Sequence, residues 1–110
     1  MGKDPDWRAL RTLAADPQTT PDELDRLSYY QDPQTLVHIA GNPNCRPATL
    51  QRLLDGPGRD VTLAVASNPA LPLATIQRLL RDFDLGIAQA AAANPSLPKP
   101  ILAMWQLTIR

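Results

Sequence analysis

The sequence predicts an all-α protein, a solenoid in which four repeats of 26 residues, each made of two short helices, stack in line. Three observations lead to this prediction. An Asp-Pro or Asn-Pro pair returns at a constant interval, apolar residues recur in the same register, and twelve prolines stand against five glycines. Since 44% of the residues are apolar and the charges balance, the chain can bury a core. Its prolines are therefore best explained as regularly spaced breaks between structural elements.

The repeat is defined by four dipeptides, which are Asp16-Pro17, Asn42-Pro43, Asn68-Pro69 and Asn94-Pro95. In this register a six-residue N-terminal extension, residues 1–6, precedes a single domain over residues 7–110. The domain divides into the blocks 7–32, 33–58, 59–84 and 85–110. When the four blocks are aligned, equivalent positions form columns. Two columns hold only leucine, isoleucine or tryptophan, and they are Leu24/Leu50/Ile76/Leu102 and Leu27/Leu53/Leu79/Trp105. A third column holds only alanine, Ala14/Ala40/Ala66/Ala92.

The first half of each block predicts a helix. Leu10, Leu13 and Ala14 show the spacing of one helix face, and equivalent apolar residues recur in the later blocks. This helix has to end before the proline, because the residue that precedes a proline is disfavoured in the α region. The position before the Asp or Asn is small in every block, so we expect close packing of the turn backbone at Ala15, Gly41, Ser67 and Ala93.

The second half of each block predicts another helix. In the first block Thr20 suits the N-cap, Pro21 the first helical position, and Glu23 the third residue of a capping box. Apolar residues follow with helical spacing, and in the third block they are Ile76, Leu79, Leu80 and Phe83. Helices of about ten residues are not stable alone, so each must depend on packing against its neighbours.

The segments 13–24, LAADPQTTPDEL, and 39–44, IAGNPN, resemble the leucine-rich repeat variant family of bacterial proteins. The resemblance covers residues 7–110 and implies a right-handed superhelix of α-helices alternating with short second helices, often 3₁₀, without strands. The repeat in this chain is slightly longer than is usual for the family, which leaves two alternatives for the second helix, a full α-helix or a 3₁₀-helix. A founding member carries an iron–sulfur cluster on N-terminal cysteines, but this chain has only Cys45, and no cluster is carried over.

The composition argues against an enzyme. One cysteine and one histidine form neither a disulfide nor a zinc or iron–sulfur site, and a Gly-rich phosphate loop is missing. We therefore expect no catalytic residue, cofactor or metal. His38 has no orienting partner at helical spacing and is expected to be a partly exposed histidine. Cys45 aligns with apolar residues and is expected to pack as a small hydrophobic side chain.

The chain shows no signal-peptide pattern and no apolar span of about 20 residues. We therefore expect a soluble, cytoplasmic protein without a membrane partner.

Two sets of residues are candidates for partner binding. Arg26, Arg52 and Arg78 occupy equivalent positions on the second helices and are expected to face solvent, where they suit carboxylates or phosphates of an extended ligand. The alternative is a solvated face that nearby acids neutralise. On the outer side of the first helices, Val37, His38 and Leu63 either line an apolar groove for a partner or are buried by the curvature of the superhelix.

The C-terminal end is a candidate association surface. The final helix is the most apolar segment, and Met104 stands where the earlier blocks have arginine. Terminal repeats normally present a polar outer face, so Met104, Trp105 and Ile109 indicate a surface for a homodimer or a docked partner. Charge is also uneven, because residues 1–32 carry seven acids and four bases, whereas residues 33–110 carry four acids and seven bases.

The predicted function is that of a non-enzymatic repeat scaffold that binds a protein or a peptide. The alternative is binding of nucleic acid or another polyanion through Arg26, Arg52 and Arg78. Eleven basic residues against eleven acidic ones, and an aromatic content of 5%, disfavour nucleic acid. Phosphate-driven binding would weaken steeply with salt, which distinguishes the two.

Overall fold

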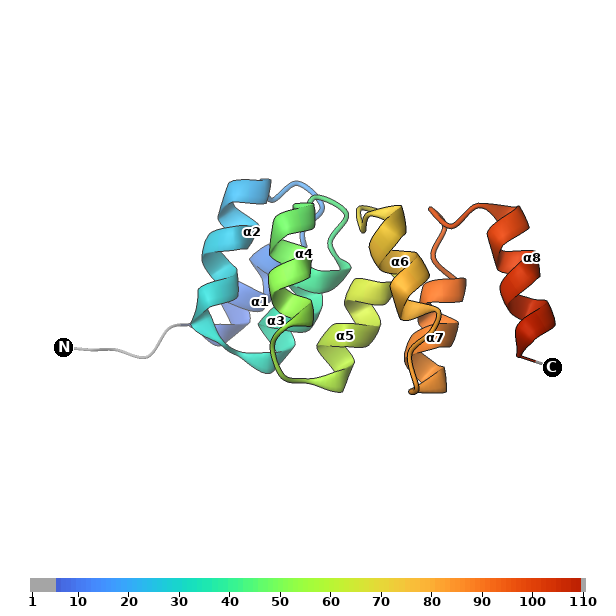
Figure 1. Ribbon diagram of the computed structural model, residues 1–110. Coiled ribbons are helices and arrows are strands. Elements are labelled where there is room, and N and C mark those ends of the chain that lie inside the picture. Colours follow the sequence, from blue (N-terminus) through green and yellow to red (C-terminus); the bar gives the residue numbers. More distant parts are fainter. Residues whose placement is uncertain (1–5, 110) are drawn as a thin grey trace.

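The computed structural model of the protein describes residues 6–109, and within that range it contains eight α-helices and no strand (Figure 1). The expectation of an all-α protein is therefore confirmed. Of the predicted N-terminal extension, residues 1–5 lie outside the described residues, as does Arg110 in the last block. The helices are α1 (Trp7–Ala15), α2 (Pro21–Leu27), α3 (Pro33–Gly41), α4 (Pro47–Leu54), α5 (Arg59–Ala66), α6 (Leu73–Leu79), α7 (Leu85–Ala92) and α8 (Lys99–Thr108), and a 3₁₀ turn, η1 (Ser28–Tyr30), follows α2.

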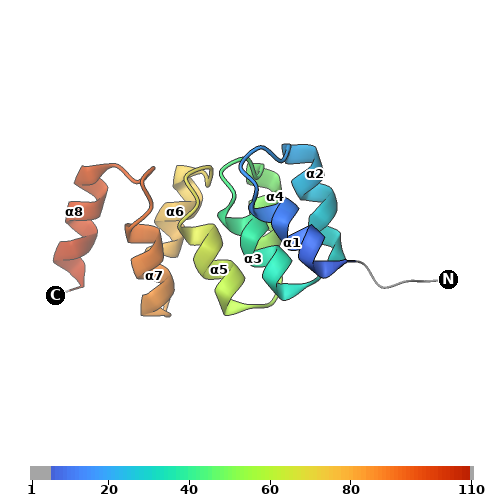
Figure 2. The same ribbon diagram turned by 180° about the vertical axis from the view of Figure 1, so that it is seen from behind.

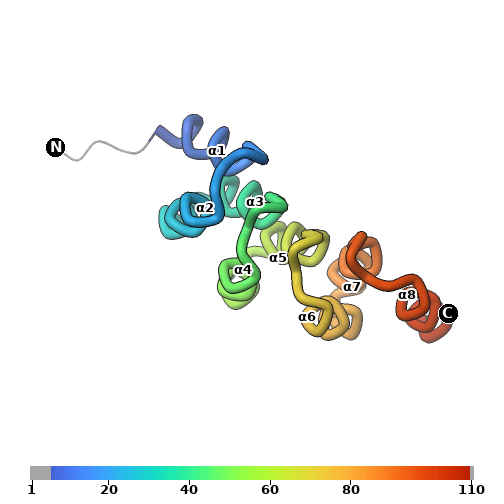
Figure 3. The backbone as a smooth tube through the Cα atoms, turned by 90° about the horizontal axis from the view of Figure 1, so that it is seen from above, coloured from blue at the N-terminus to red at the C-terminus, as the bar shows by residue number. Residues whose placement is uncertain are grey.

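The helices lie in two rows along an elongated body of 57 × 25 × 19 Å. Seen from above, α1, α3, α5 and α7 form one row, and α2, α4, α6 and α8 form the other (Figure 3). Consecutive helices of the first row pack directly on one another, α1 on α3, α3 on α5 and α5 on α7, as the view from behind also shows (Figure 2). The first row is therefore the packed spine of the molecule.

Local signals in the sequence place the ends of the first-row helices. The carboxylates of Asp6, Asp32 and Asp84 accept backbone N–H bonds at the starts of α1, α3 and α7. The start of α5 follows Gly58, whose φ of 109° suits glycine alone. At the other end, α1 stops before Asp16, whose backbone is extended with ψ of 121°, as the proline rule predicts.

The second-row helices are α-helices, which decides between the two alternatives that the repeat length left open. The Thr20 hydroxyl accepts from the Glu23 N–H at 3.2 Å, and Pro21 occupies the first helical position. The Glu23 carboxylate accepts instead from Arg26, so the predicted capping box keeps only its Thr20 half. The prediction that Phe83 belongs to the apolar stripe of α6 is wrong. Backbone hydrogen bonds from Arg81 and Asp82 to carbonyl oxygens three residues earlier close the helix after Leu79, and Phe83 is fully exposed.

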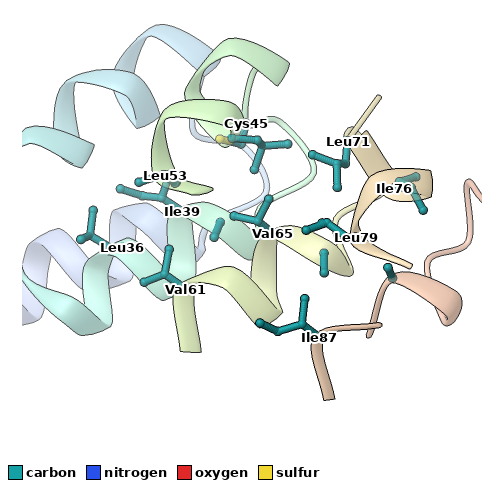
Figure 4. Close-up of a cluster of buried hydrophobic side chains, with 14 of the residues drawn as sticks. Leu36, Ile39, Cys45, Leu53, Val61, Val65, Leu71, Ile76, Leu79 and Ile87 are labelled. Carbon is teal, nitrogen blue, oxygen red and sulfur yellow. The ribbon is translucent and has the colours of Figure 1, made fainter. Parts of the chain in front are cut away.

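The hydrophobic core lies between the two rows, where Ile39, Leu53, Val65 and Leu79 gather (Figure 4). The alanine column lines the contacts between first-row helices, and Ala14, Ala40 and Ala66 are completely buried, as Ala92 nearly is. The expectation of close packing in the neighbouring column of small residues is wrong. Ala15, Gly41, Ser67 and Ala93 are exposed, and a Cβ on Gly41 would meet nothing within 4 Å, since this position points about 100° away from the alanine column.

Buried asparagines connect the turns. The Asn68 amide nitrogen donates to the carbonyl oxygens of Ala40, at 2.7 Å, and Asn42, at 2.9 Å, in the preceding turn. Its side-chain oxygen accepts from the Ala70 N–H at 2.8 Å and closes its own turn. Asn42 and Asn94 make the same three bonds in their own blocks. We call these bonds the asparagine seams; sequence analysis missed them, although the change from Asp16 to three asparagines was their signal.

Cys45 is 2% exposed and belongs to the core, so its predicted packing as a small hydrophobic side chain is confirmed. Burial raises the pKa of the Cys45 thiol to about 12, chiefly because a thiolate would lose its hydration there. None of the helices in residues 6–109 has the length and apolar character needed to cross a membrane.

Candidate functional site

The three arginines of the predicted column do not point to one common ligand. Arg26 pairs with Glu23 on its own helix at 3.2 Å. Arg52 reaches back toward the first block, where it donates to Asp25 at 2.7 Å and to the Ser28 hydroxyl at 2.8 Å. Its guanidinium also lies 4.3 Å from the centre of the Tyr29 ring. Both cations are therefore engaged within the molecule.

Asp25 is the centre of this contact between the first two blocks. Its carboxylate accepts from the Thr49 hydroxyl at 2.7 Å as well as from Arg52. The hydrogen bond from Thr49, followed by the bond and charge of Arg52, lowers the pKa of Asp25. A carboxylate held in this way positions Arg52 and leaves it less free for an external anion.

Arg78 has a different environment. It lies at the end of α6 beside Arg81, and both residues are exposed. Within residues 6–109, neither forms an ion pair with a carboxylate, whereas Arg11, Arg26, Arg46, Arg52 and Arg59 each do. The two arginines thus form an unbalanced cationic pair.

A cleft of about 910 Å³ lies between α6 and α8, and we call it the α6–α8 cleft. Its α6 side consists of Ala74, Gln77, Arg78, Leu80 and Arg81. Its α8 side consists of Ile101, Met104, Trp105, Thr108 and Ile109. The lining includes no acidic residue, so an apolar wall on α8 faces a cationic rim on α6. A volume of this size lies within the usual range of ligand-binding clefts.

A hydrogen bond and apolar packing hold the wall formed by α8 in place. The Trp105 indole N–H donates to the Leu80 carbonyl oxygen at 2.9 Å, which bridges the two sides of the cleft. Trp105, Ile101 and Leu102 are half-buried against the core, and no residue of α8 is fully buried. Met104 is 70% exposed, so the apolar surface that the sequence indicated is open to a partner.

The structure brings together two predicted sets that the sequence kept separate. Arg78 comes from the arginine column, and Met104, Trp105 and Ile109 come from the predicted association end, yet all four line the α6–α8 cleft. The sequence alone did not show that Arg81 joins them, because the block register gives Arg81 no equivalent arginine in the other blocks.

The remaining candidates do not form one surface. Val37 is half-buried and lines a pocket of about 410 Å³ with Pro57 and Val61. His38 is exposed and lies in a separate hollow between α1 and α3. Leu63 is half-buried against the core. The outer side of the first helices is therefore interrupted and offers no continuous groove.

Two further ion pairs strengthen the starts of first-row helices. Arg11 binds Asp32 through two bonds of 2.8 and 2.9 Å, and Arg59 binds Asp84 through two bonds of 2.6 and 2.9 Å. The arginine bonds are the main reason why the pKa of Asp32 is far below its ordinary value and why that of Asp84 is lowered to about 2. Among residues 6–109, no cluster of His, Cys, Asp and Glu has the geometry of a metal site.

A comparison with protein-family models matches residues 8–64 to the Leucine Rich Repeat Variant domain. Searches of the curated proteins and of the solved structures found no match to this chain. The matched segment spans more than half of the sequence and includes the first two Asp/Asn-Pro turns. The chain therefore belongs to the leucine-rich repeat variant family.

Proposed function

We propose that this chain is a non-enzymatic scaffold that binds a protein or peptide partner, and that residues 7–110 form a right-handed solenoid of four 26-residue repeats. The asparagine seams support the repeats, because equivalent bonds join atoms 26 and 28 positions apart at three successive turns. The α6–α8 cleft is the observation that carries the binding function.

The cleft supports binding because two arginines without a carboxylate partner within residues 6–109 lie in it together with exposed apolar side chains. The spine helices cover one another, and the equivalent arginines of earlier blocks bind acids within the chain. At α8, apolar side chains remain in water, where each Å² that a partner covers contributes roughly 25 cal/mol. A partner segment that fills the cleft therefore gains hydrophobic burial at Met104 and Ile101.

The test is a pull-down from the source organism with three immobilised proteins. We expect the wild type to retain a protein partner and Met104→Glu to lose it, because a carboxylate then enters the apolar wall. Leu85→Glu is the matched control, since Leu85 is 54% exposed but does not line the cleft. Equal retention by all three proteins would contradict the proposal.

The same experiment separates protein binding from polyanion binding. Retention that survives nuclease treatment, and that falls only modestly between about 50 and 200 mM salt, supports a protein or peptide partner. Retention that nuclease abolishes, and that falls by orders of magnitude between about 50 and 200 mM salt, would instead support nucleic acid.

A further inference from the structure

The α6–α8 cleft also restricts the chemistry of what enters it. We infer that it takes an acidic, amphipathic segment of a partner protein, with carboxylates against Arg78 and Arg81 and apolar side chains against Ile101, Met104 and Trp105. This inference rests on the proposed function and specifies the partner of the same cleft.

The charges that line the cleft favour an acidic segment. Arg78 and Arg81 are separated by two residues, line the cleft, and have no carboxylate partner within residues 6–109. A neutral or basic segment would cover two guanidinium groups without pairing them, which costs free energy because they lose hydration. Carboxylates offer each guanidinium a bidentate partner instead, the arrangement already seen at Arg59 and Asp84.

The position of α8 favours a segment with two unlike sides. Figure 3 shows α8 as the last helix of the row that α2, α4 and α6 begin. The Trp105 indole, fixed by its bond to the Leu80 carbonyl, holds the apolar wall opposite the cationic rim. A segment between them meets cations on one side and Met104 and Ile101 on the other. Its own side chains must therefore be acidic on one side and apolar on the other.

A second copy of this chain fits the cleft less well. A two-fold contact through the cleft brings like surfaces together, so Arg78 and Arg81 of the two copies would approach one another. The acidic N-terminal end of another copy is also largely engaged, because four of its carboxylates already pair within the chain; they are Asp22, Glu23, Asp25 and Asp32.

The experiment selects random twelve-residue peptides displayed on phage against the whole protein and three variants. Against the wild type we expect enrichment of peptides with at least two acidic and several apolar residues. The double variant Arg78→Glu/Arg81→Glu should bind those peptides at least roughly tenfold more weakly and should enrich Lys- or Arg-containing peptides instead. Met104→Glu should lose the peptides. Arg26→Glu makes one of these two charge reversals, at the position of the first block that is equivalent to Arg78, and should leave binding unchanged.

Three other outcomes would overturn this inference. Enrichment of neutral or basic peptides that Met104→Glu abolishes would overturn the acidic partner and leave the scaffold function intact. Absence of any peptide that depends on Met104 would overturn both. A wild-type dimer in sedimentation that Met104→Glu dissociates, and that the arginine variant does not affect, would show that a second copy of this chain occupies the cleft instead of an acidic segment. Circular dichroism of each variant confirms that the loss of binding is not loss of folding.

Discussion

Asn68 makes three side-chain hydrogen bonds while being only 1% exposed. Two of these bonds need an N–H donor, because they end on carbonyl oxygens of the preceding turn. An aspartate has the same shape without that donor, and it occurs only at Asp16, which has no earlier turn to contact within residues 6–109. The choice between Asn and Asp therefore follows from the stacking of turns and not from the local turn alone.

Asn68→Asp should lower the free energy of unfolding by about 3 kcal/mol at pH 7, because a buried carboxylate would face two carbonyl oxygens. The loss should shrink at low pH, where the protonated carboxyl donates one bond. Urea denaturation followed by circular dichroism measures both effects. Asp16→Asn, the reverse change at an exposed turn, should alter the stability by less than about 0.5 kcal/mol. Equal losses for the two variants would contradict the role of the seam.

The ion pair of Asp84 predicts how stability depends on pH. The folded-state pKa of Asp84 is about 2, below the value of about 3.9 in an unfolded chain. Because the folded pKa is the lower one, the stabilisation is complete above about pH 4 and is lost as the pH falls toward 2. Asp84→Asn keeps a helix cap but loses the pair with Arg59. We expect the free energy of unfolding of this variant to vary less between about pH 4 and pH 2 than that of the wild type.

Local rules explain how much of each element the sequence predicted. Proline fixes where the first-row helices stop, and Thr20 with Pro21 fixes where α2 starts, so these bounds agree with the structure. Phe83 was misplaced because apolar spacing does not report where a helix closes. The column of small residues at Ala15 does not predict burial for a related reason: a small side chain marks close packing only when it points inward, as that of Ala14 does and that of Ala15 does not.

The candidate site was predictable in pieces. The sequence singled out Arg78 and Met104 from their places in the columns. They share a cleft because of how α8 lies beside α6. These helices belong to different blocks, so the residue spacing within one block does not predict their relative position. The engagement of Arg52 by Asp25 likewise depends on how one block lies over the previous one.

At α8, one hydrogen bond should have a measurable effect. Trp105→Phe keeps a large apolar ring but removes the bond to the Leu80 carbonyl, and the free energy of unfolding should fall by about 1 kcal/mol. Amide hydrogen exchange should accelerate in α8 and remain unchanged in α3, which carries fully buried residues. Leu107→Ala, at a residue that is 62% exposed, is the control and should leave the exchange unaffected. Uniform acceleration along the chain would contradict a local role for Trp105.

For the whole molecule, the proposed repeat predicts which deletions are tolerated. Removing residues 33–58 takes out one complete block and joins Asp32 to Arg59, so that an aspartate replaces Gly58 at the start of α5. Asn68 then stands where Asn42 was and meets the carbonyls of Ala14 and Asp16. We expect a shorter, helical protein that unfolds cooperatively, with a smaller urea m-value because it exposes less surface.

The control deletion removes residues 37–60, which is 24 residues and two fewer than a complete block, and it joins Leu36 of α3 directly to Val61 of α5. Because this junction lies inside a helix, the side chains after it rotate by about 200° relative to Thr35 and Leu36, so the two parts of the fused helix cannot bury the same face. This variant should lose cooperative unfolding by circular dichroism. Equal stability of the two deletions would contradict a stack built from 26-residue units.

The asparagine seams also give the proposed stack a direction. Each amide reaches only toward the preceding turn, so the carbonyl oxygens of one block receive and the next block donates. An engineer who duplicates block 59–84 therefore inserts a donor that fits after any other block, whereas a copy of block 7–32 moved inside the array would turn the Asp16 carboxylate toward two carbonyls. Whether a block is suited to the interior of the array or only to its head depends on a single nitrogen atom.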